Sequence, residues 1–174
     1  MNESTIYKRC SVRRFTDKPV SDDEVRELLR AAMNAPSAHN RQPWRFLVIR
    51  DKDEGAAIAD NINTASFSRY APCTILVLGN VFEAKGSAYI QDCSAAVENL
   101  LLRAVEIGLG GCWIGVQHMP DRVDWVQKHF GVAYPYFPFA LVSVGTPGRE
   151  YEITDRFDES KIFWDKFTPG DMVQ

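Results

Sequence analysis

The residues best suited to binding an anion lie near the N-terminus, in residues 9–14 (RCSVRR). This segment combines arginine guanidinium groups with a serine hydroxyl, and both groups can donate hydrogen bonds to phosphate oxygens. A solvated basic turn is the alternative, and the segment taken alone does not distinguish between the two.

A second unusual segment, residues 36–44 (PSAHNRQPW), gathers hydroxyl and amide side chains between two prolines. Such a loop, held on a rigid scaffold, offers several hydrogen-bond donors and acceptors. That arrangement suits a planar heteroaromatic ligand with many polar edge atoms. An ordinary connecting turn is the alternative, but the density of hydrogen-bonding side chains favours a binding loop.

Residue spacing argues against several other chemistries. The histidines form neither H-x-x-x-H nor H-E-x-x-H, and no G-x-S-x-G occurs, so neither a metal site nor a common serine-hydrolase site is predicted. The sequence contains no C-x-x-C pair, so neither a zinc ribbon nor a thioredoxin-like motif is predicted. We expect reduced and mostly buried thiols in a cytoplasmic protein. The cysteines are Cys10, Cys73, Cys93 and Cys112.

Residues 108–111 (GLGG) invite comparison with a dinucleotide-binding loop, but their context argues against one. A Rossmann fingerprint follows a strand and opens a helix, so that the phosphate meets the helix N-terminus. Here the glycines follow a predicted helix and precede a predicted strand. We therefore expect them to end the helix.

The elements that must hold these segments interleave helices and strands. Ser21 and Glu24 form a capping box that begins a helix, which Pro36 ends. A long amphipathic helix is predicted over residues 86–107. Shorter helices are expected at residues 52–62 and 121–130, and buried strands at residues 46–49, 73–78, 112–116 and 140–144. The pattern predicts one domain of α/β or α+β class.

Composition is that of a single globular domain. The chain has 174 residues, of which 45% are hydrophobic and 25% charged, with a formal net charge of −3. This near balance provides no basic field for nucleic acid or an anionic membrane. No apolar run approaches the roughly 18 residues of a membrane span, and we expect no signal peptide. The length leaves little room for separate cofactor and substrate domains.

The C-terminal segment, residues 146–174, is polar and contains several prolines and glycines. It nevertheless carries Ile162, Phe163, Trp164 and Phe167. Because disordered tails are poor in aromatic residues, we expect this cluster to cover a surface on its own subunit or on a partner.

Together these motifs resemble the FMN-dependent nitroreductase family in its compact form. The matching pieces are residues 9–13, the loop P-S-x-x-N-x-Q-P-W, and residues 99–102 (NLLL) leading into residues 108–115 (GLGGCWIG), in family order. The resemblance spans nearly the whole chain. It implies an α+β fold with a mixed β-sheet flanked by helices. It also implies a homodimer with an FMN at each of two interfacial sites, a single domain over residues 1–174, and an arm over residues 146–174 that wraps the partner.

The resemblance further implies which residues of one subunit contact the flavin. Arg9 and Ser11 correspond to phosphate and ribityl contacts, with Cys10 alongside through its backbone. Arg13 corresponds to a residue near the N1–C2=O edge of the flavin. Arg156 matches a second basic residue that binds the phosphate.

Other contacts come from the loop, the long helix and the third strand. The loop residues expected to reach the flavin of the partner subunit are Pro36, Ser37, Ala38, Asn40 and Gln42. Gln91 occupies a position near the cofactor. Trp113, Ile114 and Gly115 are expected to pass along the ring, with the Gly115 N–H facing N5.

The activity implied is that of an NAD(P)H-dependent FMN oxidoreductase. Reduced nicotinamide gives hydride to FMN and leaves, and a small oxidised acceptor such as a nitroaromatic or a quinone takes its place. Because the cofactor carries the chemistry at N5, no side chain is assigned as a general acid or base. A positive group near N1 and C2=O should stabilise the reduced flavin.

One departure from longer family members keeps alternatives open. Only residues 79–87 separate the second strand from the long helix, where longer members insert helices that help to cover the substrate. We expect a flavin pocket that is more open or is roofed by another loop. The alternatives are an FMN storage or sensing module with little turnover, and a divergent activity such as flavin destruction or reductive dehalogenation.

Overall fold

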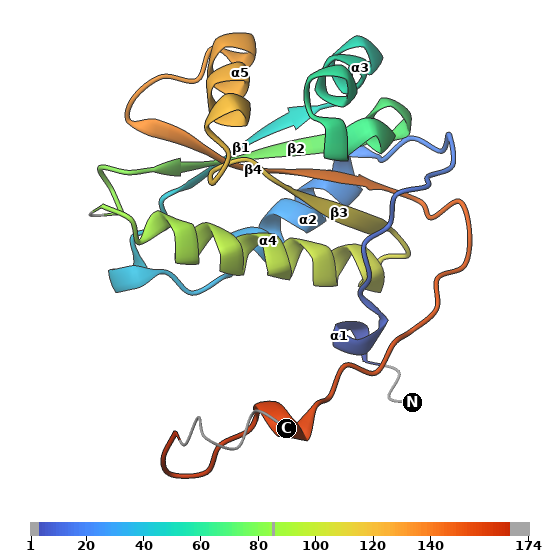
Figure 1. The fold of residues 1–174 in the computed structure, drawn as a ribbon. Helices are drawn as coiled ribbons and strands as arrows, with labels where there is room; N and C mark the ends of the chain where they lie inside the picture. The colour runs from blue at the N-terminus through green and yellow to red at the C-terminus, as the bar shows by residue number, and fades with distance from the viewer. Residues whose placement is uncertain (1–3, 85, 168–174) are drawn as a thin grey trace.

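The computed structural model describes residues 4–84 and 86–167, which form one β-sheet with helices on both faces (Figure 1). The strands are β1 (Trp44–Ile49), β2 (Cys73–Asn80), β3 (Gly110–Gly115) and β4 (Tyr136–Gly145). The helices are α1 (Thr5–Lys8), α2 (Asp22–Met33), α3 (Lys52–Asn61), α4 (Tyr89–Glu106) and α5 (Pro120–Phe130). Short 3-10 segments are η1 (Ala38–Asn40), η2 (Asn63–Tyr70) and η3 (Glu159–Lys161).

The strand order is β1-β2-β4-β3, and every pair of neighbouring strands is antiparallel. The expected α+β class is confirmed, whereas the expectation of a mixed sheet is corrected. Strands β2 and β3 run in the same direction, but β4 lies between them and is antiparallel to both. In the described part of the chain, parallel pairing is limited to one bridge between Ser11 and Gly111.

Alternate residues of each strand point to opposite faces of the sheet, and each face supports its own core. Helices α2 and α4 cover one face, where Ile75 and Val142 are fully buried (Figure 1). Segments α3, η2 and α5 cover the other face, over Leu76 and Leu141. Helix α4 is thereby fixed across the sheet, with Leu100 completely buried.

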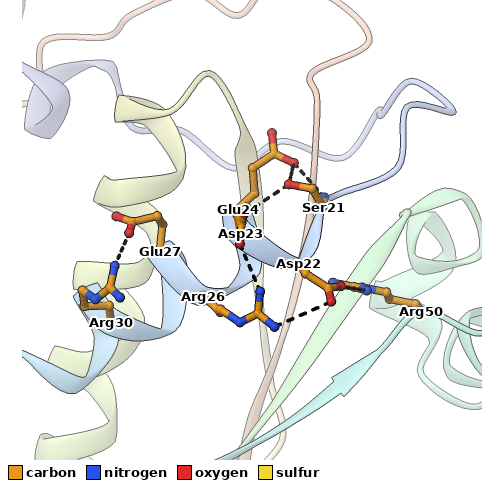
Figure 2. Close-up of polar contacts among 8 residues, drawn as sticks. All are labelled: Ser21, Asp22, Asp23, Glu24, Arg26, Glu27, Arg30 and Arg50. Atoms are coloured by element: carbon orange, nitrogen blue, oxygen red, sulfur yellow. Dashed lines mark hydrogen bonds and ion pairs between the residues drawn. The ribbon is translucent and has the colours of Figure 1, made fainter.

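The predicted capping box begins α2 at the expected residue (Figure 2). The Ser21 hydroxyl accepts a hydrogen bond from the Glu24 N–H at 3.2 Å, and the Glu24 carboxylate accepts one from the Ser21 N–H at 2.7 Å. Arg50, just after β1, donates to Asp22 at 2.6 Å. This hydrogen bond, with the guanidinium charge, holds the pKa of the Asp22 carboxyl below its usual range. The start of α2 is thereby joined to the end of β1.

Two local expectations need correction. The strand expected at residues 46–49 is not buried throughout, because β1 is an edge strand and Leu47 on its outer side is 39% exposed. The long helix begins at Tyr89 instead of residue 86, since Gly86 has φ +85°. Gly108, with φ +78°, lies at the end of α4, as expected of a glycine that ends a helix.

No helix among residues 4–84 and 86–167 is long and apolar enough to cross a membrane.

The tail leaves the sheet after β4 and continues past α1 as an extended segment (Figure 1). Its aromatic side chains are largely uncovered: Trp164 is 80% exposed and Phe167 67% exposed. The rings of Phe163 and Phe167 contact each other, with centroids 4.6 Å apart. Residues 168–174, the end of the expected arm, lie outside the described residues.

The cysteines should differ sharply in reactivity. Cys73, Cys93 and Cys112 are buried, whereas Cys10 is half-buried. Burial raises the pKa of Cys73 to about 11 and that of Cys93 to about 12, so both are protonated thiols at neutral pH. We expect Ellman's reagent to modify one thiol rapidly in the native protein and all four in guanidinium chloride. Rapid modification of a native Cys10→Ser variant would contradict this assignment.

Candidate functional site

The N-terminal segment lies against the outer edge of β3. The Val12 N–H donates to the Gly111 carbonyl at 2.9 Å, and Ser11 forms the parallel bridge with Gly111. The approach is close, because a Cβ on Gly110 would lie 2.4 Å from the Val12 side chain. Glycine at position 110 therefore allows the arginine segment to reach the sheet.

Three arginines of this segment differ in their surroundings. Arg9 lies 3.6 Å from the Glu98 carboxylate of α4. The Arg13 guanidinium lies 5.9 Å from the centroid of the Phe67 ring. Within the described residues, neither Arg13 nor Arg14 forms an ion pair with a carboxylate. Positive charge at this edge is therefore available to an anionic ligand.

Tyr151 ties the start of the tail to the same segment. Its hydroxyl accepts hydrogen bonds from the backbone N–H groups of Arg13 and Arg14, both at 3.2 Å. Arg149 stacks on the Tyr151 ring at 4.8 Å. Burial alone would raise the pKa of Tyr151, but the hydrogen bonds from Arg13, Arg149 and Arg14 outweigh it and lower that pKa. Sequence reasoning missed Tyr151, because its partners lie more than 130 residues away along the chain.

The backbone of β3 presents polar groups along its open edge. In an antiparallel pair, alternate residues point their N–H and C=O groups toward the partner strand or away from it. The Val116 N–H donates to Phe139 of β4, which assigns residue 116 to the inward set. Trp113 and Gly115 therefore point their N–H groups away from β4, on the edge that carries the arginine segment. Trp113 is half-buried and packs its ring against Phe139 at 5.6 Å.

The loop after α2 is held by its own side chains and by α4. The Ala38 N–H donates to the Asp92 carboxylate at 2.9 Å. The Ser37 hydroxyl accepts from the Gln42 N–H at 3.0 Å, and the Gln42 side-chain amide donates to the Asn40 side chain at 2.8 Å. Three of the residues expected to contact a flavin, Ser37, Asn40 and Gln42, thus belong to one hydrogen-bonded turn.

The same loop has an unusual backbone. His39 and Asn40 have φ of 53° and Gln42 has φ of 50°, all in the left-handed region. Non-glycine residues there cost about 1–3 kcal/mol each and persist only where the surroundings hold them. Such conformations concentrate at binding sites, so this geometry supports a binding loop over an ordinary connecting turn.

Asp92 is a residue that sequence reasoning missed. It lies in the first turn of α4, is 5% exposed, and has a buried Oδ2 atom with no hydrogen-bond partner in the described structure. The signal was present, because an acidic side chain interrupts the apolar face between Tyr89 and Ala96. Gln91, the neighbouring residue, is exposed.

The expected site residues fall into two groups within one chain. Residues 9–13 reach the sheet opposite Val144 of β4, whereas Pro43 of the loop reaches it opposite Tyr136. Val144 and Tyr136 are eight residues apart along β4. At about 3.3 Å per residue, the two attachment points therefore lie roughly 26 Å apart along the strand. The structure thus brings residues 9–13 to the edge of β3 near Trp113, Ile114 and Gly115. It leaves the loop at the other end of the sheet, beside the N-terminal end of α4.

Arg156 belongs to neither group. It lies on the exposed tail and lines a surface hollow with Ile6, Tyr7 and Phe157. No ion pair or hydrogen bond connects it to residues 9–13 among the described residues.

Comparison with known proteins decides the family. The sequence matches the Nitroreductase family over residues 6–74 and 64–146, which together cover most of the chain. The chain belongs to the nitroreductase family. The resemblance predicted from the arginine segment, the loop and the glycine-rich segment is confirmed.

Several relatives of this nitroreductase-family chain extend over nearly its full length. A protein of Archaeoglobus fulgidus, provisionally named NADH dehydrogenase/NAD(P)H nitroreductase, is 35% identical over 167 residues, covering 93% of this chain and 96% of its own. A similarly named protein of Parabacteroides distasonis has a crystal structure with a TM-score of 0.91 and 32% identity, covering 94% of this chain and 96% of its own. A provisionally named nitroreductase of Desulfovibrio desulfuricans, crystallised in complex with FMN, has a TM-score of 0.81 and 29% identity, with the same coverage.

The hydrogen bond from Ala38 to Asp92 should hold the loop against α4. We expect Asp92→Ala to lower the free energy of unfolding by about 1–3 kcal/mol and to speed amide hydrogen exchange over residues 37–42. In Asp92→Asn, which keeps an acceptor for the Ala38 N–H, the exchange of these amides should be slower than in Asp92→Ala. Identical exchange in wild type and Asp92→Ala would show that this contact does not hold the loop.

Proposed function

We propose that this nitroreductase-family oxidoreductase uses FMN to pass electrons from NAD(P)H to a small oxidised acceptor, such as a nitroaromatic or a quinone, by a ping-pong mechanism. The observation that carries the proposal is the open edge of β3. The arginine segment lies along this edge beside outward-pointing backbone N–H groups, and two of its arginines, Arg13 and Arg14, form no ion pair with a carboxylate among the described residues. One edge can thus contact both an anionic phosphate and the polar atoms of a planar ring.

The residues of this edge fit FMN. Arg9 and Ser11 bind the phosphate and the ribityl chain, Cys10 contributes its backbone, and Arg13 lies toward the N1–C2=O edge of the flavin. The FMN-bound relative from Desulfovibrio desulfuricans supports the choice of cofactor. Net positive charge at this edge offsets the negative charge of the phosphate.

Residues of β3 orient the ring. Trp113, Ile114 and Gly115 pass along it, and the Gly115 N–H points toward N5. When bound, FMN would supply the hydride-accepting and electron-donating chemistry between reduced nicotinamide and the acceptor. The protein supplies binding, orientation and electrostatic stabilisation, so no side chain of this chain is assigned to proton transfer.

The site is completed by a second copy of the chain. Separation of the two groups of site residues by roughly 26 Å along β4 supports a homodimer in which the loop reaches the flavin of the partner subunit. Gln91 accompanies this loop at the start of α4. The loop residues involved are Pro36, Ser37, Ala38, Asn40 and Gln42.

The exposed tail supports the same assembly. Trp164 is 80% exposed, and so large an aromatic surface is stabilised by burial against another subunit. We assign residues 146–174 to an arm that wraps the partner and brings Arg156 toward a flavin phosphate.

Strand β2 and helix α4 are joined by only residues 81–88, so the flavin lacks the cover that an insertion would provide. Small acceptors of differing shape can therefore reach it.

Anaerobic stopped-flow spectroscopy tests the activity. After reconstitution with FMN, mixing with NADH or NADPH should bleach the flavin absorbance within the time of one turnover, and an added nitroaromatic or quinone should restore it. Bound flavin that stays oxidised with both nicotinamides would favour a storage or sensing module. Failure to bind FMN at all would exclude both functions.

Arg9 tests the phosphate assignment. Loss of a charge-assisted hydrogen bond costs about 1.5–3 kcal/mol, so Arg9→Ala should raise the dissociation constant of FMN roughly 10- to 150-fold. Arg26→Ala is the control, because Arg26 is paired with Asp22 and Asp23 on the exposed side of α2 (Figure 2). Titration of FMN fluorescence measures both variants. Equal affinities for wild type and Arg9→Ala would refute the assignment.

A further inference from the structure

A second cation, Arg122, stands at the end of β3 that is remote from the arginine segment. We propose that Arg122 is a positioning residue of the flavin site, which fixes the Gly115 end of the edge and favours the reduced flavin through its positive charge. This inference rests on the proposed function, because it places the flavin along β3.

The guanidinium of Arg122 connects three elements. From the first turn of α5, its Nη1 donates to the Gly115 carbonyl at 2.7 Å. Its Nη2 donates to the Thr64 hydroxyl at 3.0 Å and lies 3.4 Å from the Asn63 side-chain oxygen, both in η2. The planar fork therefore clamps the last residue of β3 against η2 and α5.

Every acceptor in this set is electrically neutral. Within the described residues, Arg122 forms no ion pair with a carboxylate, although Asp121 and Asp124 lie on the same helix. Arg103 on α4 shows the contrast, because it donates to Glu27 at 2.7 Å and to Glu106 at 2.9 Å. No paired carboxylate among the described residues therefore offsets the positive charge of Arg122 beside Gly115.

The backbone of Gly115 lies at the open edge of β3, with the His118 ring over its Cα. The Gly115 N–H points off the edge of the sheet, because the N–H of the next residue, Val116, is bonded to Phe139 of β4. A Cβ at this position would lie 2.4 Å from the His118 ring, whose side chain is exposed. By fixing the Gly115 carbonyl, Arg122 restrains the backbone that presents this N–H to a flavin.

The charge has a direct consequence for reduction. Hydride transfer breaks a C–H bond of reduced nicotinamide, forms an N–H bond at the flavin, and moves two electrons. The nicotinamide becomes oxidised, and the flavin gains one negative charge. A fixed cation that has no ion pair to break stabilises this negative charge without reorganisation. Arg13, over the Phe67 ring, provides one such charge, and Arg122 provides a second beside Gly115.

Two substitutions separate charge from structure. Arg122→Gln keeps a donor for the Gly115 carbonyl but removes the charge, whereas Arg122→Lys keeps the charge. Each variant, reconstituted with FMN, is equilibrated with dithionite and a reference dye to give the midpoint potential. Thermal melts and FMN titrations are recorded in parallel, with Arg26→Gln as the control.

For Arg122→Gln we expect about a tenfold fall in the ratio of reduced to oxidised flavin at a given potential, which corresponds to about 30 mV for a two-electron couple. Arg122→Lys should stay closer to wild type, and Arg26→Gln should match it. An unchanged potential in Arg122→Gln would overturn the role of Arg122. Equal shifts in Arg122→Gln and Arg122→Lys would overturn it too, because they would indicate a purely structural role. Wild-type protein that fails to bind FMN would instead overturn the proposed function.

Discussion

The close approach of the N-terminal segment to β3 is the constraint on which the candidate site depends. A hydrogen bond from the Val12 N–H to the Gly111 carbonyl, at 2.9 Å, and the parallel bridge between Ser11 and Gly111 join the two. Only a residue without a side chain fits at position 110, because a Cβ there would meet Val12. This contact places the arginine segment along the outer edge of the sheet. A ligand bound there would contact both the arginines and the backbone of β3. Tyr151 reinforces it from the tail.

The arginines of this protein serve two different purposes. Those on α2 and α4, such as Arg26 and Arg103, are paired with carboxylates at the surface. Exposed pairs of this kind contribute only about 0–1 kcal/mol each. Arg13 instead lies over the Phe67 ring, and Arg122 donates to the neutral Gly115 carbonyl at the end of β3. The formal charge of −3 thus conceals a local positive field, and that field is where an anionic cofactor is bound in the proposed function.

Local sequence signals predicted the elements well, since they act within one turn or one strand. The Ser21 capping box set the start of α2, and Gly108 ended α4, because both effects depend on neighbouring residues. The family was predicted from sequence motifs, and the match to the Nitroreductase family confirms that prediction. Strand β1 was wrongly expected to be buried, since a run of apolar residues does not reveal which strand lies at the edge of a sheet.

Long-range contacts explain what sequence reasoning missed at the candidate site. Asp92 holds a loop 54 residues away, and Arg122 contacts η2 58 residues away. Neither pairing follows from periodicity or from a motif. The placement of residues 9–13 beside β3 also required the sheet order, because β3 becomes an edge strand only when β4 inserts between it and β2.

A mixed dimer tests most directly whether two chains build each flavin site. One chain carries Arg9→Ala and the other Asn40→Ala, each with a different affinity tag, and dimers that hold both tags are isolated. If each site combines the arginine segment of one chain with the loop of the other, one site carries both substitutions and its twin carries neither. We expect one FMN to bind per mixed dimer with wild-type affinity. Two weakened sites, one lacking Arg9 and the other lacking Asn40, with none of wild-type affinity, would show that each site lies within a single chain.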